Sequence, residues 1–283
     1  MASLPSKLIL EPLLKGWLLE DIGRGDRTTE AIFPLGSSTG KAHWLLKEDG
    51  VIAGLPIAKQ VFQLLDEKIV FLDKITEGDS CISGTILVEI EGSKDALLTG
   101  ERVALNLVMH LSGIATMTRK YVEAIADYPT QLVDTRKTTP GLRILEKYAT
   151  QVGGAVNHRM GLDDAVMIKD NHIEAAGSIA RAIALIRDKI PYPLTIEVET
   201  NNLAQVQEAI EHQADIIMLD NMAIPTMKEA VKIIQQAHKK IKSEASGNVT
   251  LDNIAQIAET GVDFISTSAT ITRAPWLDLS MKF

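Results

Sequence analysis

From about residue 130 onward, short apolar runs alternate with helical stretches in a repeating order. The runs are QLVD, AVMIKD, TIEVE, DIIMLD, SEAS and DFIST, and they end near Asp134, Lys169, Glu199, Asp220, Ser246 and Thr267. Successive ends are 35, 30, 21, 26 and 21 residues apart, enough for a strand, a helix and two loops. Repeated βα units of this kind predict a parallel sheet that is closed or nearly closed into a barrel. Because six units are fewer than eight, the residues favour an incomplete or modified barrel.

The first hundred residues predict a mixture of α and β structure. Residues 42–48 and 51–53 are expected to form strands around the Asp49-Gly50 turn, and 56–66 has helical spacing. Apolar stretches at 69–72 and 85–91 flank a turn-rich segment, and Ser93 then precedes a long amphipathic run. We place the main domain boundary near that run.

Composition excludes several classes of protein. Asp and Glu outnumber Lys and Arg by 37 to 29, so a general nucleic-acid surface is disfavoured, although a local cationic pocket is not. Cys81 is the only cysteine, which excludes internal disulfides and sites built on several thiolates, and fits a reducing compartment. No apolar run reaches the roughly 18 residues of a membrane helix, and Glu11, Pro12 and Lys15 interrupt any secretory segment. We therefore expect a cytoplasmic protein with no membrane or nucleic-acid partner.

Polar side chains gather where the predicted barrel strands end, which is where βα barrels carry their function. These residues are Asp134, Arg136, Lys137, Lys169, Asp170, His172, Glu197, Glu199, Asp220, Asn221, Glu244, Ser246 and Gly247. A second cationic pair, His158-Arg159, lies between the first two strand ends. The simplest interpretation of these residues is that the rim of a barrel is polar. The order of charges, with cations early and carboxylates in the middle, also suits an anionic substrate held beside a metal-bound one. The small residues 246–250 and 267–270 predict either helix caps or a phosphate site.

Several motifs resemble those of the quinolinate phosphoribosyltransferase family, also called carboxylating nicotinate-nucleotide pyrophosphorylases. They are DTRKTTPGLRILEKYA (134–149), GGAVNHRMGLDDAVMIKDNHI (153–173), EVE (197–199), DIIMLDN (215–221) and EASGNVTLDNIAQIAETGVDFIS (244–266). The likeness continues upstream through 101–116 and 20–34, so it covers nearly the whole chain. The combination of DTRKT, NHR and KDNH at these separations is highly specific.

The resemblance implies a fold and a reaction. The fold is α/β: an N-terminal α/β sandwich domain over residues 1–112 and an incomplete, about seven-stranded α/β barrel over 113–273, with the tail 274–283 packing on the first domain. The implied enzyme is a pentosyltransferase of NAD biosynthesis. It joins quinolinate to phosphoribosyl pyrophosphate with Mg²⁺ and yields nicotinate mononucleotide, pyrophosphate and CO₂. Family members are homodimers or dimer-based assemblies with shared active sites.

The resemblance also assigns roles to individual residues. Arg136, Arg159 and Lys169 would hold the two quinolinate carboxylates with support from His158, and Arg102 would reach across from the partner subunit. Lys137 would face the pyrophosphate, and Glu199 and Asp220 would lie beside the ribose hydroxyls and Mg²⁺. Lys137, Lys169, Glu199 and Asp220 form the implied catalytic set. The expected 5′-phosphate site comprises Ser246, Gly247, Asn248 and Ser268, and there the chain departs from the common pattern at Asn248, Ser268 and Thr272.

Other functions are compatible with the same residues. A related pyrophosphorylase-like protein of molybdenum transport is the nearest alternative within the resemblance, and nicotinate could replace quinolinate as substrate. From the chemistry alone, Lys169 with Glu199 and Asp220 could serve a barrel lyase that forms a Schiff base or abstracts a proton. A non-catalytic dimeric binding protein is the third alternative. The arginine pair favours a dicarboxylate, because a buried unpaired guanidinium costs about 2–5 kcal/mol.

Overall fold

The chain folds into two compact units, each assembled from separate stretches of the sequence. The computed structural model describes residues 2–33, 38–237 and 239–283, so Pro34, the last residue of the 20–34 motif, lies outside it. The first unit comprises residues 1–119, 144–154 and 273–283, and the second comprises 120–143 and 155–272. The two units thus alternate along the sequence, and both ends of the chain belong to the first.

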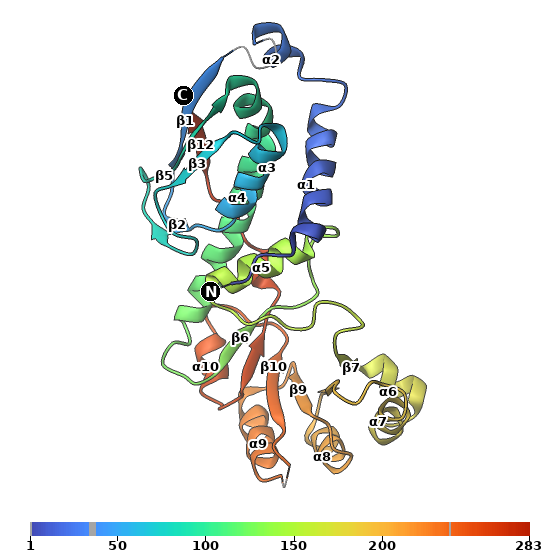
Figure 1. Ribbon diagram of the computed structural model, residues 1–283. Helices are drawn as coiled ribbons and strands as arrows, with labels where there is room; N and C mark the ends of the chain where they lie inside the picture. Colours follow the sequence, from blue (N-terminus) through green and yellow to red (C-terminus); the bar gives the residue numbers. More distant parts are fainter. Residues whose placement is uncertain (1, 34–37, 238) are drawn as a thin grey trace. The chain divides into compact units, whose positions relative to one another are not determined.

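The first unit contains most of the helices of the N-terminal half and two small sheets. Its elements are α1 (Lys7–Ile22), α2 (Arg27–Ile32), β1 (Thr39–Leu46), β2 (Gly50–Val51), α3 (Leu55–Leu65), β3 (Val70–Asp73), β4 (Ser80–Cys81), β5 (Ile86–Ser93), α4 (Lys94–Glu123), α5 (Arg143–Gly153) and β12 (Leu279–Lys282). An antiparallel sheet has the order β12-β1-β5-β3, and helices α3 and α4 lie beside it (Figure 1). This arrangement confirms the expected α/β character of the N-terminal part.

The core of the first unit forms where the sheet meets α3. Along β1 every second side chain is buried, as a strand with one covered face requires, and Trp44 is fully buried. The Trp44 ring lies 6.1 Å from the ring centroids of both Phe62 and Phe71. Gly100 of α4 lets the two helices approach closely, since a Cβ there would lie 2.9 Å from Phe62.

The C-terminal residues return to the first unit after the barrel strands. Leu277 donates a backbone hydrogen bond to Met109 of α4 at 3.0 Å, and β12 pairs antiparallel with β1. The chain passes so close to α4 that a Cβ on Gly113 would lie 1.9 Å from the backbone oxygen of Pro275. Glycine is therefore required at this crossing.

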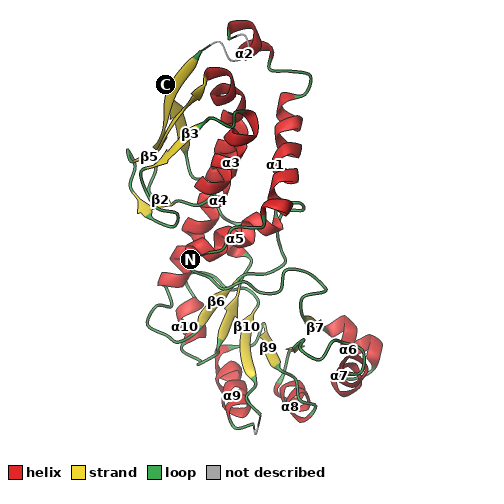
Figure 2. Ribbon diagram, in the orientation of Figure 1, coloured by secondary structure: helices red, strands yellow, loops and turns green. Residues whose placement is uncertain are grey.

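The second unit is a parallel sheet whose strands alternate with helices. Its elements are β6 (Gln131–Val133), β7 (Val166–Ile168), α6 (Asp170–Ala176), α7 (Ile179–Arg187), β8 (Ile196–Thr200), α8 (Leu203–Glu211), β9 (Ile216–Asp220), α9 (Ile224–Gln235), β10 (Lys242–Ser246), α10 (Ile254–Ala258), β11 (Phe264–Ser266) and α11 (Ala269–Thr272). The strand order is β6-β11-β10-β9-β8-β7, and every pairing is parallel (Figure 2). Helices such as α8 and α9 line the outside of the curved sheet.

The six predicted strands are confirmed, and each ends within one residue of its predicted position. The incomplete barrel is confirmed as well, although the expected number of about seven strands is met only in part. Among the described residues six strands are assigned, and beyond β6 a single parallel bridge joins Val156 to Val133. The segment around Val156 thus occupies the seventh position without forming a strand.

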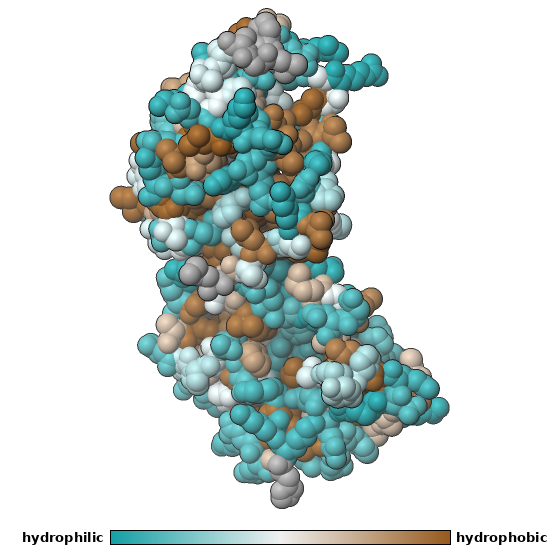
Figure 3. All heavy atoms as spheres, viewed as in Figure 1, coloured by the Kyte–Doolittle hydropathy of each residue, from teal (hydrophilic) through white to brown (hydrophobic). Residues whose placement is uncertain are grey.

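Hydrophilic residues dominate the visible surface, with smaller apolar groups scattered among them (Figure 3). Two of the exposed apolar side chains are on α1, where Leu8 and Leu19 are 87% and 68% exposed. Within the described part of the chain, no helix has the length and apolar character needed to cross a bilayer.

Candidate active site

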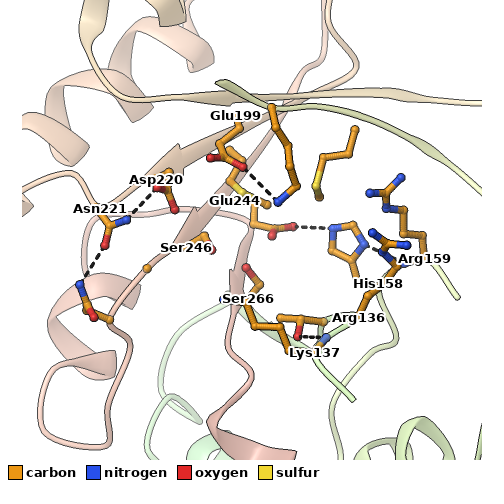
Figure 4. Close-up of a pocket in the computed structure, with 16 residues that line it drawn as sticks. Arg136, Lys137, His158, Arg159, Glu199, Asp220, Asn221, Glu244, Ser246 and Ser266 are labelled. Atoms are coloured by element: carbon orange, nitrogen blue, oxygen red, sulfur yellow. Dashed lines mark hydrogen bonds and ion pairs between the residues drawn. The ribbon is translucent and has the colours of Figure 1, made fainter. Parts of the chain in front are cut away.

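The carboxyl ends of the parallel strands surround one pocket of about 520 Å³ (Figure 4). It is lined by Thr135, Arg136, Lys137, His158, Arg159, Met167, Lys169, Glu199, Met218, Asp220, Asn221, Glu244, Ser246, Gly247, Asn248 and Ser266. The pocket therefore brings together every predicted site residue except Arg102 and Ser268. Residues more than a hundred positions apart in the sequence meet here because parallel strands all end at the same edge of the sheet.

Cationic side chains occupy the side of the pocket formed by the loop after β6 and the segment 157–159. The loop and the segment are held together by Asp134, which is buried and accepts hydrogen bonds from the Asn157 amide at 2.6 Å and the His158 backbone at 2.8 Å. Arg159 donates from Nη1 to the Ala165 carbonyl at 2.9 Å. Burial and the neighbouring Arg136 guanidinium lower the pKa of Arg159. The charge of an anion bound beside the two arginines would offset both effects on the pKa of Arg159.

Carboxylates occupy the opposite side, at the ends of the neighbouring strands β8 and β9. The Lys169 ammonium lies 3.5 Å from an oxygen of Glu199. Burial is the main cause that raises the pKa of Glu199, and the nearby charge of Asp220 adds to it. Asp220 accepts a hydrogen bond from the amide of Asn221 at 2.7 Å. Two neighbouring carboxylates of this kind form a site that attracts a cation or a set of hydroxyl groups.

The loop after β10 has an unusual backbone that brings it close to Asn221. Gly247, Asn248 and Asn221 all have positive φ angles, of 96°, 49° and 51°. A Cβ on Gly247 would lie 2.3 Å from the amide oxygen of Asn221, so glycine is needed there. The Asn248 amide donates to that same Asn221 oxygen at 3.0 Å. Asn248 therefore links the predicted phosphate loop to the acidic side of the pocket.

Two predicted site residues lie outside the lining. Arg102 is an exposed residue of α4 in the first unit, and Ser268 directly precedes the short helix α11 in the second. Among the residues that the structure describes, neither lines this pocket. Their expected contacts with substrate stay predictions.

The structure adds lining residues that the predicted site omits. They are Thr135, Met167, Met218, Asn221, Glu244 and Ser266. Asn221 and Glu244 were visible in the sequence as polar residues at strand ends. The two methionines could have been predicted to face the pocket from the alternation of side chains along a strand. Met218, for example, lies in register between Glu199 and Glu244 on the adjacent strands.

His158, Glu197 and Glu244 form a cluster of possible metal ligands in the same region, all within 4.8 Å of one another. The His158 Nε2 atom lies 3.0 Å from Glu197 and 3.7 Å from Glu244. Burial and the charge of Glu197 raise the pKa of Glu244 to about 8. The pocket thus contains two acidic groupings, one open at Glu199 and Asp220 and one buried behind His158.

Comparison with known proteins agrees with this geometry. Two family models match, the N-terminal domain of quinolinate phosphoribosyl transferase over residues 26–112 and its C-terminal domain over 114–282. A probable carboxylating nicotinate-nucleotide pyrophosphorylase of Synechocystis is 62% identical, covering 100% of this chain and 95% of that protein. The corresponding probable enzyme of Bacillus subtilis is 44% identical, covering 97% and 93%.

Solved structures give the same result for the whole chain. NadC from Streptococcus pyogenes superposes with a TM-score of 0.94 at 42% identity, covering 99% of this chain and 98% of that one. The nicotinate-nucleotide pyrophosphorylase from Francisella tularensis gives a TM-score of 0.92 at 37% identity, with the same coverage of both chains. Both domain models and full-length relatives are thus matched, and the chain belongs to the quinolinate phosphoribosyl transferase family.

Proposed function

We propose that this chain transfers the phosphoribosyl group of phosphoribosyl pyrophosphate to quinolinate and releases CO₂. The products are nicotinate mononucleotide and pyrophosphate, as expected for a step of NAD biosynthesis. The observation that carries the proposal is the pocket itself, in which Arg136 and Arg159 line one side and Glu199 and Asp220 the other. The names of the relatives, carboxylating nicotinate-nucleotide pyrophosphorylases, support the same reaction.

The arginine side of the pocket suits quinolinate. This substrate has carboxylates on adjacent ring carbons, and planar guanidinium groups bind such oxygens in pairs. At about 4 Å, one opposite charge contributes roughly 4 kcal/mol near a protein surface before desolvation is subtracted. Several cations are therefore needed to hold a small dianion, and Lys169 adds a third to the two arginines.

The acidic side suits the ribose and Mg²⁺. Glu199 and Asp220 would hold the ion, since carboxylate oxygens are ligands that Mg²⁺ accepts and the repulsion that raises the pKa of Glu199 would fall beside a cation. When bound, Mg²⁺ supplies positive charge to the departing pyrophosphate. Lys137 adds to that charge, and the loop 246–248 would receive the 5′-phosphate.

Positioning and electrostatics account for most of the chemistry. Cleavage of the ribose carbon–oxygen bond gives positive charge to the ribose ring, which Glu199 stabilises from the acidic side. The quinolinate nitrogen bonds to the ribose carbon as pyrophosphate leaves, and the ring nitrogen becomes cationic. That cation stabilises the carbanion formed when CO₂ leaves the adjacent carbon, which then takes up a proton. The protein's task is to align the two substrates.

One assay tests the proposal against its alternatives. We expect the purified protein to form nicotinate mononucleotide from quinolinate and phosphoribosyl pyrophosphate, with the rate lost in EDTA and restored by Mg²⁺. Nicotinate is the control acceptor and should give at most a small fraction of that rate. If the protein used nicotinate but not quinolinate as the acceptor, the quinolinate assignment would be contradicted. If it converted substrate at a rate that did not depend on phosphoribosyl pyrophosphate, a lyase would be favoured.

We also infer a homodimer with shared sites, in which Arg102 of one subunit reaches the pocket of the other. An interface on the first unit is supported by three exposed side chains, Arg102 on α4 and Leu8 and Leu19 on α1.

A cytoplasmic location is part of the proposal too. The single thiol supports it, because burial raises the pKa of Cys81 and an unreactive free thiol suits a reducing compartment.

A further inference from the structure

His158, Glu197 and Glu244 form a cluster at the wall of the pocket, which His158 and Glu244 line, and the proposed reaction gives the two glutamates no role. The side chains of both glutamates are 4% exposed, and that of His158 is 14% exposed. Figure 4 shows the His158 ring directed toward Glu244, with Arg159 on its other side. One carboxylate oxygen of each glutamate, Oε1, has no hydrogen-bond partner among the described residues.

A metal ion is the first occupant to consider, because a histidine and two carboxylates are common ligands. The protonation of His158 argues against it. Its Nδ1 atom accepts a hydrogen bond from the Arg159 backbone N–H at 2.7 Å, so Nδ1 carries no proton. In a neutral imidazole the proton is then on Nε2, the atom that faces the two glutamates. A proton, rather than a metal, therefore joins the histidine to the carboxylates.

The charges of the cluster fit this hydrogen-bonded arrangement. The Nε2–H group lies 3.0 Å from Glu197 and 3.7 Å from Glu244, so Glu197 is its acceptor. Burial and the charge of Glu197 favour the protonated form of Glu244, whose pKa is raised to about 8. The Glu197 carboxylate also favours the cationic form of Arg159.

We propose that Glu197 is a positioning residue for quinolinate binding and acts through His158. The carboxylate fixes the imidazole by accepting from Nε2–H, and the imidazole in turn fixes the Arg159 backbone through Nδ1. Arg159 is thereby held in the pocket beside Arg136. The inference rests on the proposed function, because quinolinate is the ligand whose binding it explains.

Kinetics of Glu197→Gln test the proposal. The amide keeps the shape of the side chain but removes the charge that strengthens the hydrogen bond. We expect KM for quinolinate to rise about tenfold or more while KM for phosphoribosyl pyrophosphate changes less than about twofold. Glu229→Gln, on the exposed face of α9, is the matched control and should leave both constants unchanged. Equal effects on both substrates would overturn the inference, because a general structural role would not separate them.

A double-mutant cycle asks whether Glu197 acts through the histidine. His158→Asn keeps an acceptor near the Arg159 N–H but removes the donor that faces Glu197. In that background Glu197→Gln should raise KM for quinolinate by less than about twofold. A full additional tenfold rise would mean that Glu197 acts on the substrate by another route, and the inference would be wrong.

A spectroscopic measurement gives a result that does not depend on activity. Ring ¹⁵N NMR of histidine-labelled protein, with His158→Asn used to assign the signals, should show His158 with its proton on Nε2. Addition of Zn²⁺ should leave those signals in place. A proton on Nδ1, or a shift on binding Zn²⁺, would replace the inference with a metal site. A wild-type protein that fails to make nicotinate mononucleotide would instead contradict the proposed function, and the NMR result would still stand.

Discussion

At the scale of single residues, Glu244 is a carboxylic acid that the fold keeps from water. Glu197 and His158 face it from β8 and from the segment before β7, and Ser266 of β11 donates to it. Burial and the Glu197 charge raise its pKa from 4.5 to about 8. The folded chain therefore binds this proton more tightly than the unfolded chain does. The resulting stabilisation is complete below about pH 4.5 and is lost as the pH rises through about 8.

This shift predicts a pH-dependent difference in stability between the wild type and Glu244→Gln. The amide has no proton to lose, so its free energy of unfolding should lack this pH dependence. We expect the Tm of the wild type to fall relative to that of Glu244→Gln as the pH rises from about 5 to about 8, and the difference to level off above that pH. Thermal unfolding of both proteins at each pH measures the difference, and parallel curves would contradict the assigned titration.

The residue types of the pocket could be predicted from sequence, but their contacts could not. The arginines and lysines at the strand ends line the pocket together with Glu199, Asp220 and Glu244, because the ends of parallel strands meet. Three other strand-end acids, Asp134, Asp170 and Glu197, lie outside the lining. Asn248, which departs from the family pattern, is accommodated because asparagine tolerates the left-handed φ of 49° better than most residues. Its hydrogen bond to Asn221 joins two separate loops, and no local pattern in the sequence indicates such a bond.

At the scale of secondary structure, prediction succeeded where an apolar run is bounded by polar residues. The barrel strands, α3 and the long helix α4 were all anticipated. The helix α1 was missed, although Leu10, Leu14 and Leu18 recur every four residues and are buried. Pro12 lies inside this helix and interrupts its apolar character, which hid the signal. The seventh barrel position was not predictable, because Val156 forms one bridge rather than a run of paired residues.

Two glycines inside helices of the first unit give a matched prediction. Gly113→Ala should lower the free energy of unfolding by about 2 kcal/mol, because the new methyl group would collide with the backbone of Pro275. Gly16 of α1 has open space around it, so Gly16→Ala should raise the free energy by about 0.5–1 kcal/mol. Urea unfolding of both variants measures the two effects. A Gly113→Ala protein as stable as Gly16→Ala would show that residues 275–277 do not pack on α4.

At the scale of the whole molecule, the proposed sharing of active sites predicts that two inactive variants restore activity when mixed. Arg102→Ala and Lys169→Ala would each remove a different part of every site. In a mixed dimer with Arg102 acting in trans, one site lacks both groups and the other is intact. After complete exchange of equal amounts, half of the dimers are mixed, so about one quarter of the wild-type activity should return.

Exchange must be verified independently, for example by purifying mixed dimers that carry two different affinity tags. The matched control combines Lys169→Ala with Glu199→Ala, whose substitutions both lie in the pocket of the second unit. A mixed dimer of these two has one substitution in each site and should stay inactive. Two outcomes would argue against the role of Arg102 in trans. One is recovery of activity by the control pair, and the other is no recovery of activity by the test pair after verified exchange.

The return of β12 to the sheet of the first unit has a consequence for how the chain folds as it is made. On the ribosome, β1 emerges long before residues 279–282, and the barrel strands are synthesised between them. The edge of β1 thus waits for its last neighbour throughout the synthesis of the barrel strands. A polypeptide that ends before β12 would carry all the barrel strands and an open sheet edge, a state suited to recognition by chaperones or proteases.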